Sequence, residues 1–160
     1  MLRNMTGVYL SCGGKMLLLY RQGGRVVNDT WVASAGGHFE KDELNDPEAC
    51  VLRELNEELG LTRDDLTDFR LRYVGLRNAG DEIRQNYYFF AGLRPEKADG
   101  LVSDEGKCKW VDYADVLSLD MPRTAKALMA HYMETGRFTE ALYSAVSDGK
   151  AFHFTEMAGG

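Results

Sequence analysis

The chain has 160 residues, a length that suits one domain with a substantial core. Its net charge of −6 argues against a nucleic-acid polymer as partner, because such binding relies on clustered Lys and Arg. The acidic balance does not exclude a small anionic substrate whose charge a metal screens, and the longest apolar runs are far too short to span a membrane.

The first 40 residues predict a strand pair and a glycine turn. Two apolar segments joined by Gly13-Gly14 indicate a hairpin, and Gly36-Gly37 follows a further short strand. The expected elements are strands at 5–12, 15–21 and 31–33, with a polar loop at 22–30.

A helix is expected from 47 to 59. Asp46 is a typical N-cap, Pro47 suits the first helical position, and Gly60 suits the C-terminal end. An apolar stripe that can pack on a sheet consists of Leu52, Leu55 and Leu59.

The second half of the chain mixes strands and a helix. Asp120 is expected to cap that helix and Gly136 to end it, while Asp148-Gly149 forms the turn of a terminal hairpin. The expected elements are strands at 70–77, 84–93 and 109–111, a helix at 122–135, and a hairpin from Ala141 to Phe154. This order predicts an α/β domain with a partly antiparallel, mixed sheet.

The cysteines are Cys12, Cys50 and Cys108, an odd number of widely separated thiols. That pattern disfavours a disulfide or zinc framework and fits a reducing, cytoplasmic compartment, as does the absence of a signal-peptide apolar region at the start. All three are expected to be buried as small apolar side chains.

Three carboxylates share one face of the helix at 47–59. On a helical wheel Glu54, Glu57 and Glu58 fall within an arc of about 100°. Two interpretations compete. The acids can form a solvated face, which is the usual fate of a charge run, or they can bind a divalent cation, which would relieve their mutual repulsion.

The residues from Gly37 to Leu61 resemble the signature of the Nudix hydrolase family, G-x5-E-x7-R-E-U-x-E-E-x-G-U, where U is apolar. The second half matches completely, with Arg53, Glu54, Leu55, Glu57, Glu58, Gly60 and Leu61. The first half matches as Gly37 and Glu43, but nine residues instead of seven separate Glu43 from Arg53. Standard spacing would place Asn45 there, so the match leaves the role of Glu43 open.

The resemblance covers most of the chain and implies a single Nudix hydrolase domain over 1–160. The fold it implies is an α/β/α sandwich with a mixed sheet and a C-terminal hairpin. The implied activity is hydrolysis of a nucleoside diphosphate linked to another group X. Mg²⁺ or Mn²⁺ would screen the phosphates and acidify bound water. The resemblance assigns the metal to Glu54, Glu57, Glu58 and the Gly37 carbonyl, and suggests that Arg53 orients the carboxylates.

Two acids outside the helix are further candidates by resemblance. Glu40 is either a metal ligand or base, or a solvated loop charge, and Glu105 is either a base or ligand, or a turn residue. The segment from Ser103 to Trp110 is similar to one found in MutT-type enzymes that cleave 8-oxo-dGTP. Asp120 follows where those enzymes carry base-contacting acids, although its capping role needs no such contact.

The strand at 84–93 carries the substrate-binding candidates. Arg84, Asn86 and Tyr88 alternate along one face and either line a pocket for phosphate and base or form a solvated surface. The leading hypothesis is a pyrophosphohydrolase of a (d)NTP such as 8-oxo-dGTP. The alternatives are another Nudix substrate (a nucleotide sugar, ADP-ribose or a dinucleotide polyphosphate) and a nucleotide-binding sensor without turnover. A homodimer is common in the family.

Overall fold

The computed structural model describes residues 1–22 and 29–159, so most of the expected loop at 22–30 lies outside the described residues. Eight strands form one sheet in the order β3-β2-β1-β5-β4-β7-β8, with β6 paired to β2. The β1–β5 and β4–β7 pairs are parallel and the other pairs are antiparallel, so the sheet is mixed. The strands are β1 (Leu2–Cys12), β2 (Lys15–Arg21), β3 (Thr30–Val32), β4 (Leu66–Asn78), β5 (Ile83–Leu93), β6 (Lys107–Asp112), β7 (Tyr143–Ser147) and β8 (Phe152–Glu156).

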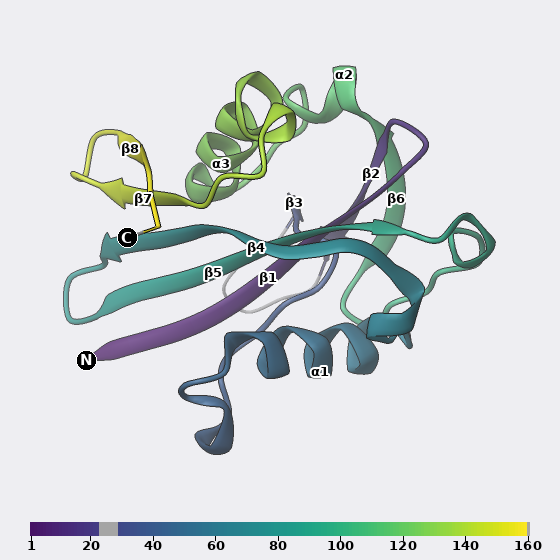
Figure 1. Ribbon diagram of the computed structural model, residues 1–160, viewed down its shortest axis with the longest axis horizontal. Coiled ribbons are helices and arrows are strands. Elements are labelled where there is room, and N and C mark those ends of the chain that lie inside the picture. The colour runs from purple at the N-terminus through teal and green to yellow at the C-terminus, as the bar shows by residue number, and fades with distance from the viewer. Residues whose placement is uncertain (23–28, 160) are drawn as a thin grey trace.

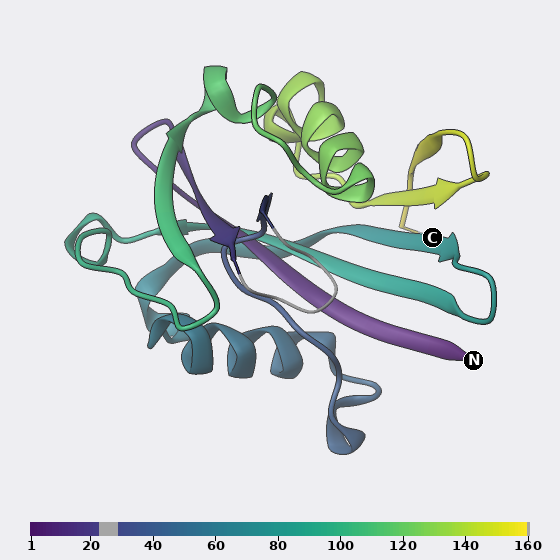
Figure 2. The same ribbon diagram turned by 180° about the vertical axis from the view of Figure 1, so that it is seen from behind.

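Helices cover both faces of this sheet. The helix α1 (Pro47–Leu59) lies on one face, and α3 (Arg123–Glu134) lies on the other with the short α2 (Tyr113–Val116) beside it (Figures 1 and 2). The β7–β8 hairpin continues the sheet beyond β4, and Asp148-Gly149 lie in its turn. The expected α/β/α sandwich with a mixed sheet and a C-terminal hairpin is therefore confirmed. Among the described residues, no helix is long and apolar enough to cross a membrane.

The bounds and caps of α1 agree with the sequence. The Asp46 side chain accepts a hydrogen bond from the Ala49 N–H at 2.9 Å, which satisfies one of the free donors of the first turn. At the other end Gly60 adopts a left-handed φ of 66°, and its N–H donates to the Asn56 carbonyl at 2.9 Å. These caps hold the carboxylate-bearing turns of α1 at a defined position along the sheet.

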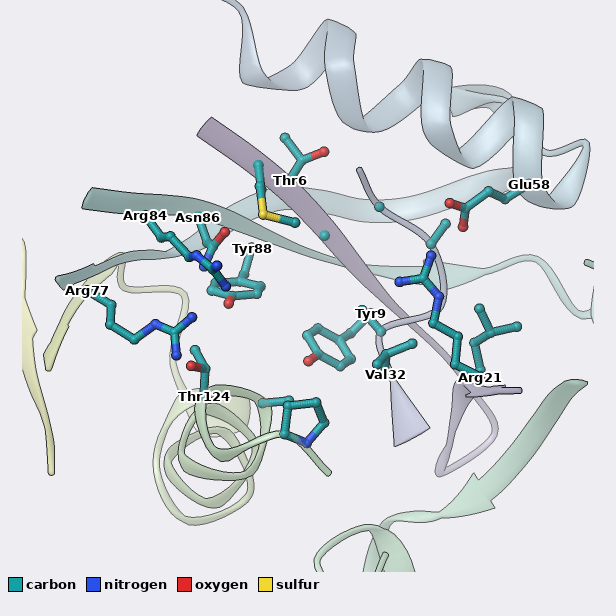
Figure 3. Close-up of a pocket in the computed structure, with 18 residues that line it drawn as sticks. Thr6, Tyr9, Arg21, Val32, Glu58, Arg77, Arg84, Asn86, Tyr88 and Thr124 are labelled. Carbon is teal, nitrogen blue, oxygen red and sulfur yellow. The ribbon is translucent and has the colours of Figure 1, made fainter. Parts of the chain in front are cut away.

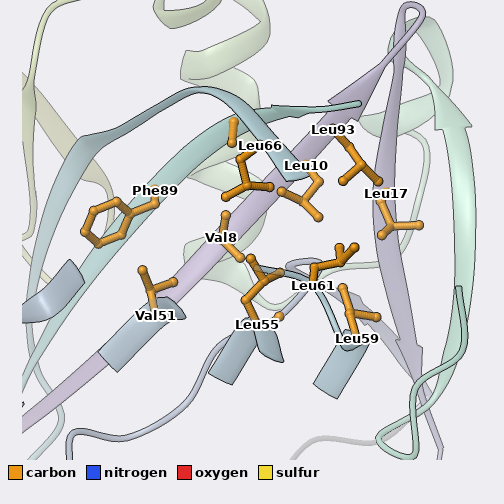
Figure 4. Packing of buried hydrophobic residues seen from close by; sticks show 12 residues of the cluster. Val8, Leu10, Leu17, Val51, Leu55, Leu59, Leu61, Leu66, Phe89 and Leu93 are labelled. Carbon is orange, nitrogen blue, oxygen red and sulfur yellow. The ribbon is translucent and has the colours of Figure 1, made fainter. Parts of the chain in front are cut away.

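Two apolar clusters form the core, one on each face of the sheet. The cluster under α1 contains Leu55 and Leu59, with Leu52 at its margin, packed on Val8 and Leu10 of β1 (Figure 4). The apolar stripe expected on α1 is therefore packed against the sheet, and the acidic face of the helix points away from this core. The second cluster joins α3 to the opposite face.

Three expectations about local structure are wrong. Pro122, not Asp120, occupies the N-cap of α3, and no side chain caps this helix. Because proline has no N–H to leave unpaired, it suits a helix start, and the N-cap of α3 therefore lies two residues later than expected. Gly136 does not end α3, because the C-cap is Thr135 and Gly136 begins a 3₁₀ turn. Only Cys50 is fully buried, while Cys12 and Cys108 are half-buried; all three are free thiols.

Candidate functional site

Arg53 stands at the centre of an ion-pair network on α1. Its Nε and Nη2 donate to the two carboxylate oxygens of Glu43 at 2.6 and 3.0 Å. Its Nη1 donates to Glu54 at 2.9 Å and to Glu57 at 3.0 Å, and Nη2 also reaches the His38 carbonyl at 3.1 Å. One guanidinium thus links the loop before the helix to two of the three candidate carboxylates, in the fork geometry that favours arginine over lysine.

Glu43 takes part in this network despite the two extra residues in the loop. A 3₁₀ turn (Lys41–Glu43) brings it back toward the helix, where it is 7% exposed. The hydrogen bonds from Arg53 hold the pKa of its carboxyl down at about 2, against the opposing effect of burial. The Glu40 N–H donates to the same carboxylate at 2.9 Å, while the Glu40 side chain is exposed.

The Gly36-Gly37 turn permits two close approaches. A Cβ on Gly36 would overlap the Thr6 carbonyl and the Gly7 Cα of β1, and both are backbone atoms that cannot move aside. A Cβ on Gly37 would stand 2.7 Å from Glu54 Oε2 and closer still to Oε1. The turn therefore lies directly on the Glu54 carboxylate, and the Gly37 carbonyl accepts a hydrogen bond from the Thr6 N–H at 2.8 Å.

Glu58 lies at the edge where α1 meets this turn. Burial, together with the negative charges of Glu54 and Glu105, raises the pKa of its carboxyl to about 7, and the Gly36 N–H and Arg21 act in the opposite direction. Glu105 is exposed and forms an ion pair with Arg21 at 2.7 Å. Repulsion among these acids is what a divalent cation relieves, so carboxylate oxygens of the kind Mg²⁺ prefers are present at this edge.

A cavity of about 240 Å³ opens beside Glu58 on the α3 face of the sheet. Its floor includes Tyr88, whose ring lies between two strand glycines: a Cβ would stand 3.4 Å from the ring at Gly7 and 3.3 Å at Gly75. Figure 3 shows Glu58 at one end of the cavity and Arg84 at the other. The polar side chains lining it are Thr6, Tyr9, Arg21, Glu58, Arg77, Arg84, Asn86, Tyr88 and Thr124.

The structure thus places the sequence-predicted residues in two adjoining groups. Arg53, Glu54 and Glu57 form the network on α1, and Glu58 faces the cavity that contains Arg84, Asn86 and Tyr88. Asp120 does not line this cavity, and its carbonyl accepts hydrogen bonds from Trp31 and Thr30.

Within residues 1–22 and 29–159 no three His, Cys, Asp or Glu side chains converge on one point as metal ligands do. Glu54 and Glu57 turn toward Arg53 instead, at 2.9 and 3.0 Å. The donor chemistry nonetheless fits a hard divalent cation, because the candidates are carboxylates and a backbone carbonyl. Glu57 is 57% exposed and free to rotate toward such an ion.

Five polar cavity residues were not predicted from the sequence: Thr6, Tyr9, Arg21, Arg77 and Thr124. The alternation of β1 would have shown that Tyr9 shares a face with Gly7, but the parallel pairing of β1 with β5 that brings Tyr9 beside Tyr88 joins residues about 80 apart in the chain. Such long-range pairing leaves no local pattern in the sequence.

Comparison with known proteins agrees with this fold. The NUDIX domain family matches residues 1–132. No curated protein sequence matches the chain. A mutator MutT protein from Bacillus halodurans superposes with a TM-score of 0.69 at 20% identity, covering 96% of this chain and 97% of that one.

Two further solved structures show the same fold. A NUDIX hydrolase from Nitrosomonas europaea has a TM-score of 0.69 at 15% identity, with 91% of this chain and 78% of that chain covered. An Ap4A hydrolase from C. elegans has a TM-score of 0.61 at 20% identity, with coverage of 84% and 98%. At these identities the likeness concerns the fold alone. The family match over more than half of its length shows that the chain belongs to the Nudix family of hydrolases.

Proposed function

We propose that the chain is a metal-dependent pyrophosphohydrolase that cleaves a nucleoside diphosphate linked to X. The first substrate proposed is a (d)NTP such as 8-oxo-dGTP, with a nucleoside monophosphate and pyrophosphate as products. A MutT protein and an Ap4A hydrolase among the structural neighbours support a nucleotide substrate, and leave X open. A cytoplasmic location, which the free thiols favour, and a homodimer belong to the same proposal.

The observation that carries the proposal is the position of Glu58. Its carboxylate comes from the signature helix and opens into the same cavity as Arg84, Asn86 and Tyr88 (Figure 3). A phosphate chain at the Glu58 end would leave the rest of the nucleotide over the tyrosine floor. The cavity volume of about 240 Å³ suits part of a nucleotide more than a whole macromolecular ligand.

Each part of the site has a distinct proposed role. Glu54, Glu57, Glu58 and the Gly37 carbonyl would hold Mg²⁺ or Mn²⁺, which when bound neutralises phosphate charge and acidifies water. Arg53 is a positioning residue, because it donates to Glu54 and Glu57 without lining the cavity. A carboxylate at this edge accepts the proton of the attacking water as the phosphoanhydride bond breaks.

The candidates for that general base are Glu58, Glu105 and Glu40. Glu58 lines the cavity, and Glu105 is close enough to raise the pKa of Glu58. Glu40 is exposed, and its backbone N–H, not its carboxylate, donates a hydrogen bond to the Glu43 carboxylate. The order Glu58, Glu105, Glu40 is therefore the order in which substitution to glutamine is expected to lower kcat.

A substrate panel with Mg²⁺ tests the proposal. The panel contains 8-oxo-dGTP, the four ordinary dNTPs, ADP-ribose and diadenosine polyphosphates, and the products are identified. Release of pyrophosphate and a monophosphate from a triphosphate supports the first substrate. Cleavage of ADP-ribose or a diadenosine polyphosphate alone supports the proposed hydrolysis but refutes a (d)NTP as the substrate. Tight nucleotide binding without any turnover identifies a sensor and refutes the hydrolase.

The variant Glu57→Gln tests the role of the helix carboxylates. It is expected to lower kcat by about 100-fold or more while the melting temperature stays near that of the wild type, because Glu57 is exposed. Glu48→Gln is the matched control, since Glu48 lies on the same helix, is exposed, and pairs only with Arg63 among the described residues. Near wild-type activity of Glu57→Gln would show that the metal assignment is wrong.

A further inference from the structure

Two arginines face each other across neighbouring strands at the end of the cavity remote from Glu58. Arg77 of β4 is the register partner of Arg84 of β5, and both line the cavity. Figure 3 shows their side chains side by side at that end. Like charges directly opposite each other in an antiparallel pair destabilise the folded chain, so this arginine pair is unfavourable for folding.

The acids nearby do not balance the two charges. Arg84 pairs with Glu82 at 2.6 Å, but Glu82 is shared with Arg3 at 3.4 Å. Arg77 forms no ion pair with any residue that the structure describes. This end of the cavity is therefore cationic in a chain whose net charge is −6.

Further hydrogen-bond donors point into the same space. Tyr9 is only 2% exposed and lines the cavity, and its hydroxyl is a hydrogen-bond donor. Figure 3 shows that hydroxyl directed into the cavity, and Thr124 next to Arg77. Thr124 belongs to the first turn of α3, whose N-terminus has no side-chain cap. The hydroxyls of Tyr9 and Thr124 can donate hydrogen bonds to an anionic group bound in the cavity.

The cationic end is well separated from Glu58. The Gly36 N–H faces Glu58, and Gly36 packs on Gly7 of β1. Arg84 is the register partner of Arg3 on β1. Arg3 lies four residues before Gly7 on that strand, so about 13 Å of strand separates the Arg84 position from the Gly7 position near Glu58. One phosphoanhydride is too short to bridge that distance, so the group bound here is not the one being cleaved.

From these observations we infer that the Arg77–Arg84 end of the cavity binds a second anionic group of the substrate, a phosphate or a carboxylate remote from the scissile anhydride. The inference rests on the proposed function for what happens at the Glu58 end. The oxidised guanine of 8-oxo-dGTP offers carbonyl acceptors to the same arginines. A charged acceptor makes roughly twice as strong a hydrogen bond, so an anionic group there improves the substrate.

Three related dinucleotides test the inference by equilibrium binding in EDTA, where metal-dependent turnover is blocked. NAD⁺ is the reference, NADP⁺ adds a phosphate, and nicotinic acid adenine dinucleotide replaces the neutral carboxamide by a carboxylate of the same shape. We expect one of the two anionic ligands to bind about tenfold or more tightly than NAD⁺. The ligand that does so tells whether the pocket is placed for phosphate or carboxylate.

Arg77→Ala is expected to abolish that preference while it changes NAD⁺ binding by less than about threefold. Arg70→Ala is the matched control, because Arg70 lies on the same strand, pairs with exposed acids, and does not line this cavity. Arg77→Ala removes a like-charge pair, so its melting temperature is expected to equal or exceed that of the wild type. Equal affinity for all three dinucleotides, no measurable binding of any, or an unchanged preference in Arg77→Ala would overturn the inference.

Hydrolysis of the same dinucleotides and of 8-oxo-dGTP with Mg²⁺ separates this inference from the proposed function. Preferential binding without cleavage of any compound refutes the hydrolase and keeps the anion site. Cleavage with no preference in binding or in kcat/KM keeps the hydrolase and refutes the anion site.

Discussion

Substituting Glu43 by glutamine tests whether the lengthened loop is a working part of the site. The change keeps the size of the side chain and removes its charge. In the native structure both carboxylate oxygens accept from Arg53, at 2.6 and 3.0 Å, and the side chain is 9% exposed. Glutamine retains one acceptor oxygen, and its amide group faces a guanidinium N–H to which it cannot bond.

The expected loss of stability follows from those two contacts. A hydrogen bond to a charged group contributes roughly 1.5–3 kcal/mol, so losing one of the two bonds and removing the negative charge from the other is expected to cost about 2–3 kcal/mol. Arg53 keeps Glu54, Glu57 and the His38 carbonyl as partners, which keeps the loss below that of a fully orphaned buried charge. In a chain of this size the melting temperature should fall by about 5–10 °C.

The pH dependence of stability provides a second test of the Glu43–Arg53 ion pair. The pKa of Glu43 is lowered from 4.5 to about 2, so its ionised form stabilises the folded chain. That contribution is complete above pH 4.5 and is lost as the pH falls through 2. Thermal melts of wild type and Glu43→Gln should therefore differ most at neutral pH and converge as the pH drops below 4.5.

The control for this prediction is Asp42→Asn, an exposed neighbour in the same 3₁₀ turn. It should shift the melting temperature by no more than about 1 °C. If Glu43→Gln behaves like Asp42→Asn, or if its deficit persists undiminished at pH 3, the ion pair with Arg53 does not hold the loop and the reasoning is refuted.

Three further substitutions address other parts of the structure. Gly37→Ala should keep the melting temperature but lower kcat/KM by about tenfold to 100-fold, because the added Cβ displaces the Glu54 carboxylate and no backbone atom. Unchanged kinetics would show that catalysis does not need Glu54 in its present position. Asp46→Ala should cost about 1 kcal/mol in chemical denaturation by removing the bond to Ala49, and a loss near zero would mean that the cap is unimportant. Leu55→Ala should cost about 2–5 kcal/mol, since Leu55 is fully buried; a cost under 1 kcal/mol would mean that the core under α1 collapses to fill the space.

The sequence predicted most of the local structure because local interactions determine it. The bounds of α1 were correct to the residue, since Asp46 and Gly60 cap it with their own side chain and backbone. The hairpin at Gly13-Gly14 was equally local, and both glycines adopt the positive φ that such a turn requires. The cap of α3 was wrong because Asp120 and Pro122 are both plausible starts, and only packing against β3 decides between them.

The site was predicted less completely because its parts meet through tertiary contacts. Counting residues along the loop made Glu43 an uncertain member, since a count assumes one backbone path. The 3₁₀ turn at Lys41–Glu43 shortens that path and returns the carboxylate to Arg53. Where a surface loop can accommodate an insertion, the number of residues between Glu43 and Arg53 can change while their ion pair is kept.

The Arg77–Arg84 pair shows the same limit on the substrate side. Seven positions separate the two residues in the chain, and that spacing means nothing until β4 and β5 pair in a particular register. A slip of one residue would turn one arginine to the opposite face and remove the cationic end of the cavity. A register shift lies between Leu71 and Tyr73, and from there the pairing of Tyr73 with Tyr88 leads without a break to Arg77 and Arg84. Tyr73 is fully buried, so its packing fixes the register at this end. The apolar core under the sheet therefore determines which charges meet at the ligand end, and a core mutation that shifts this register should change substrate preference before it abolishes folding.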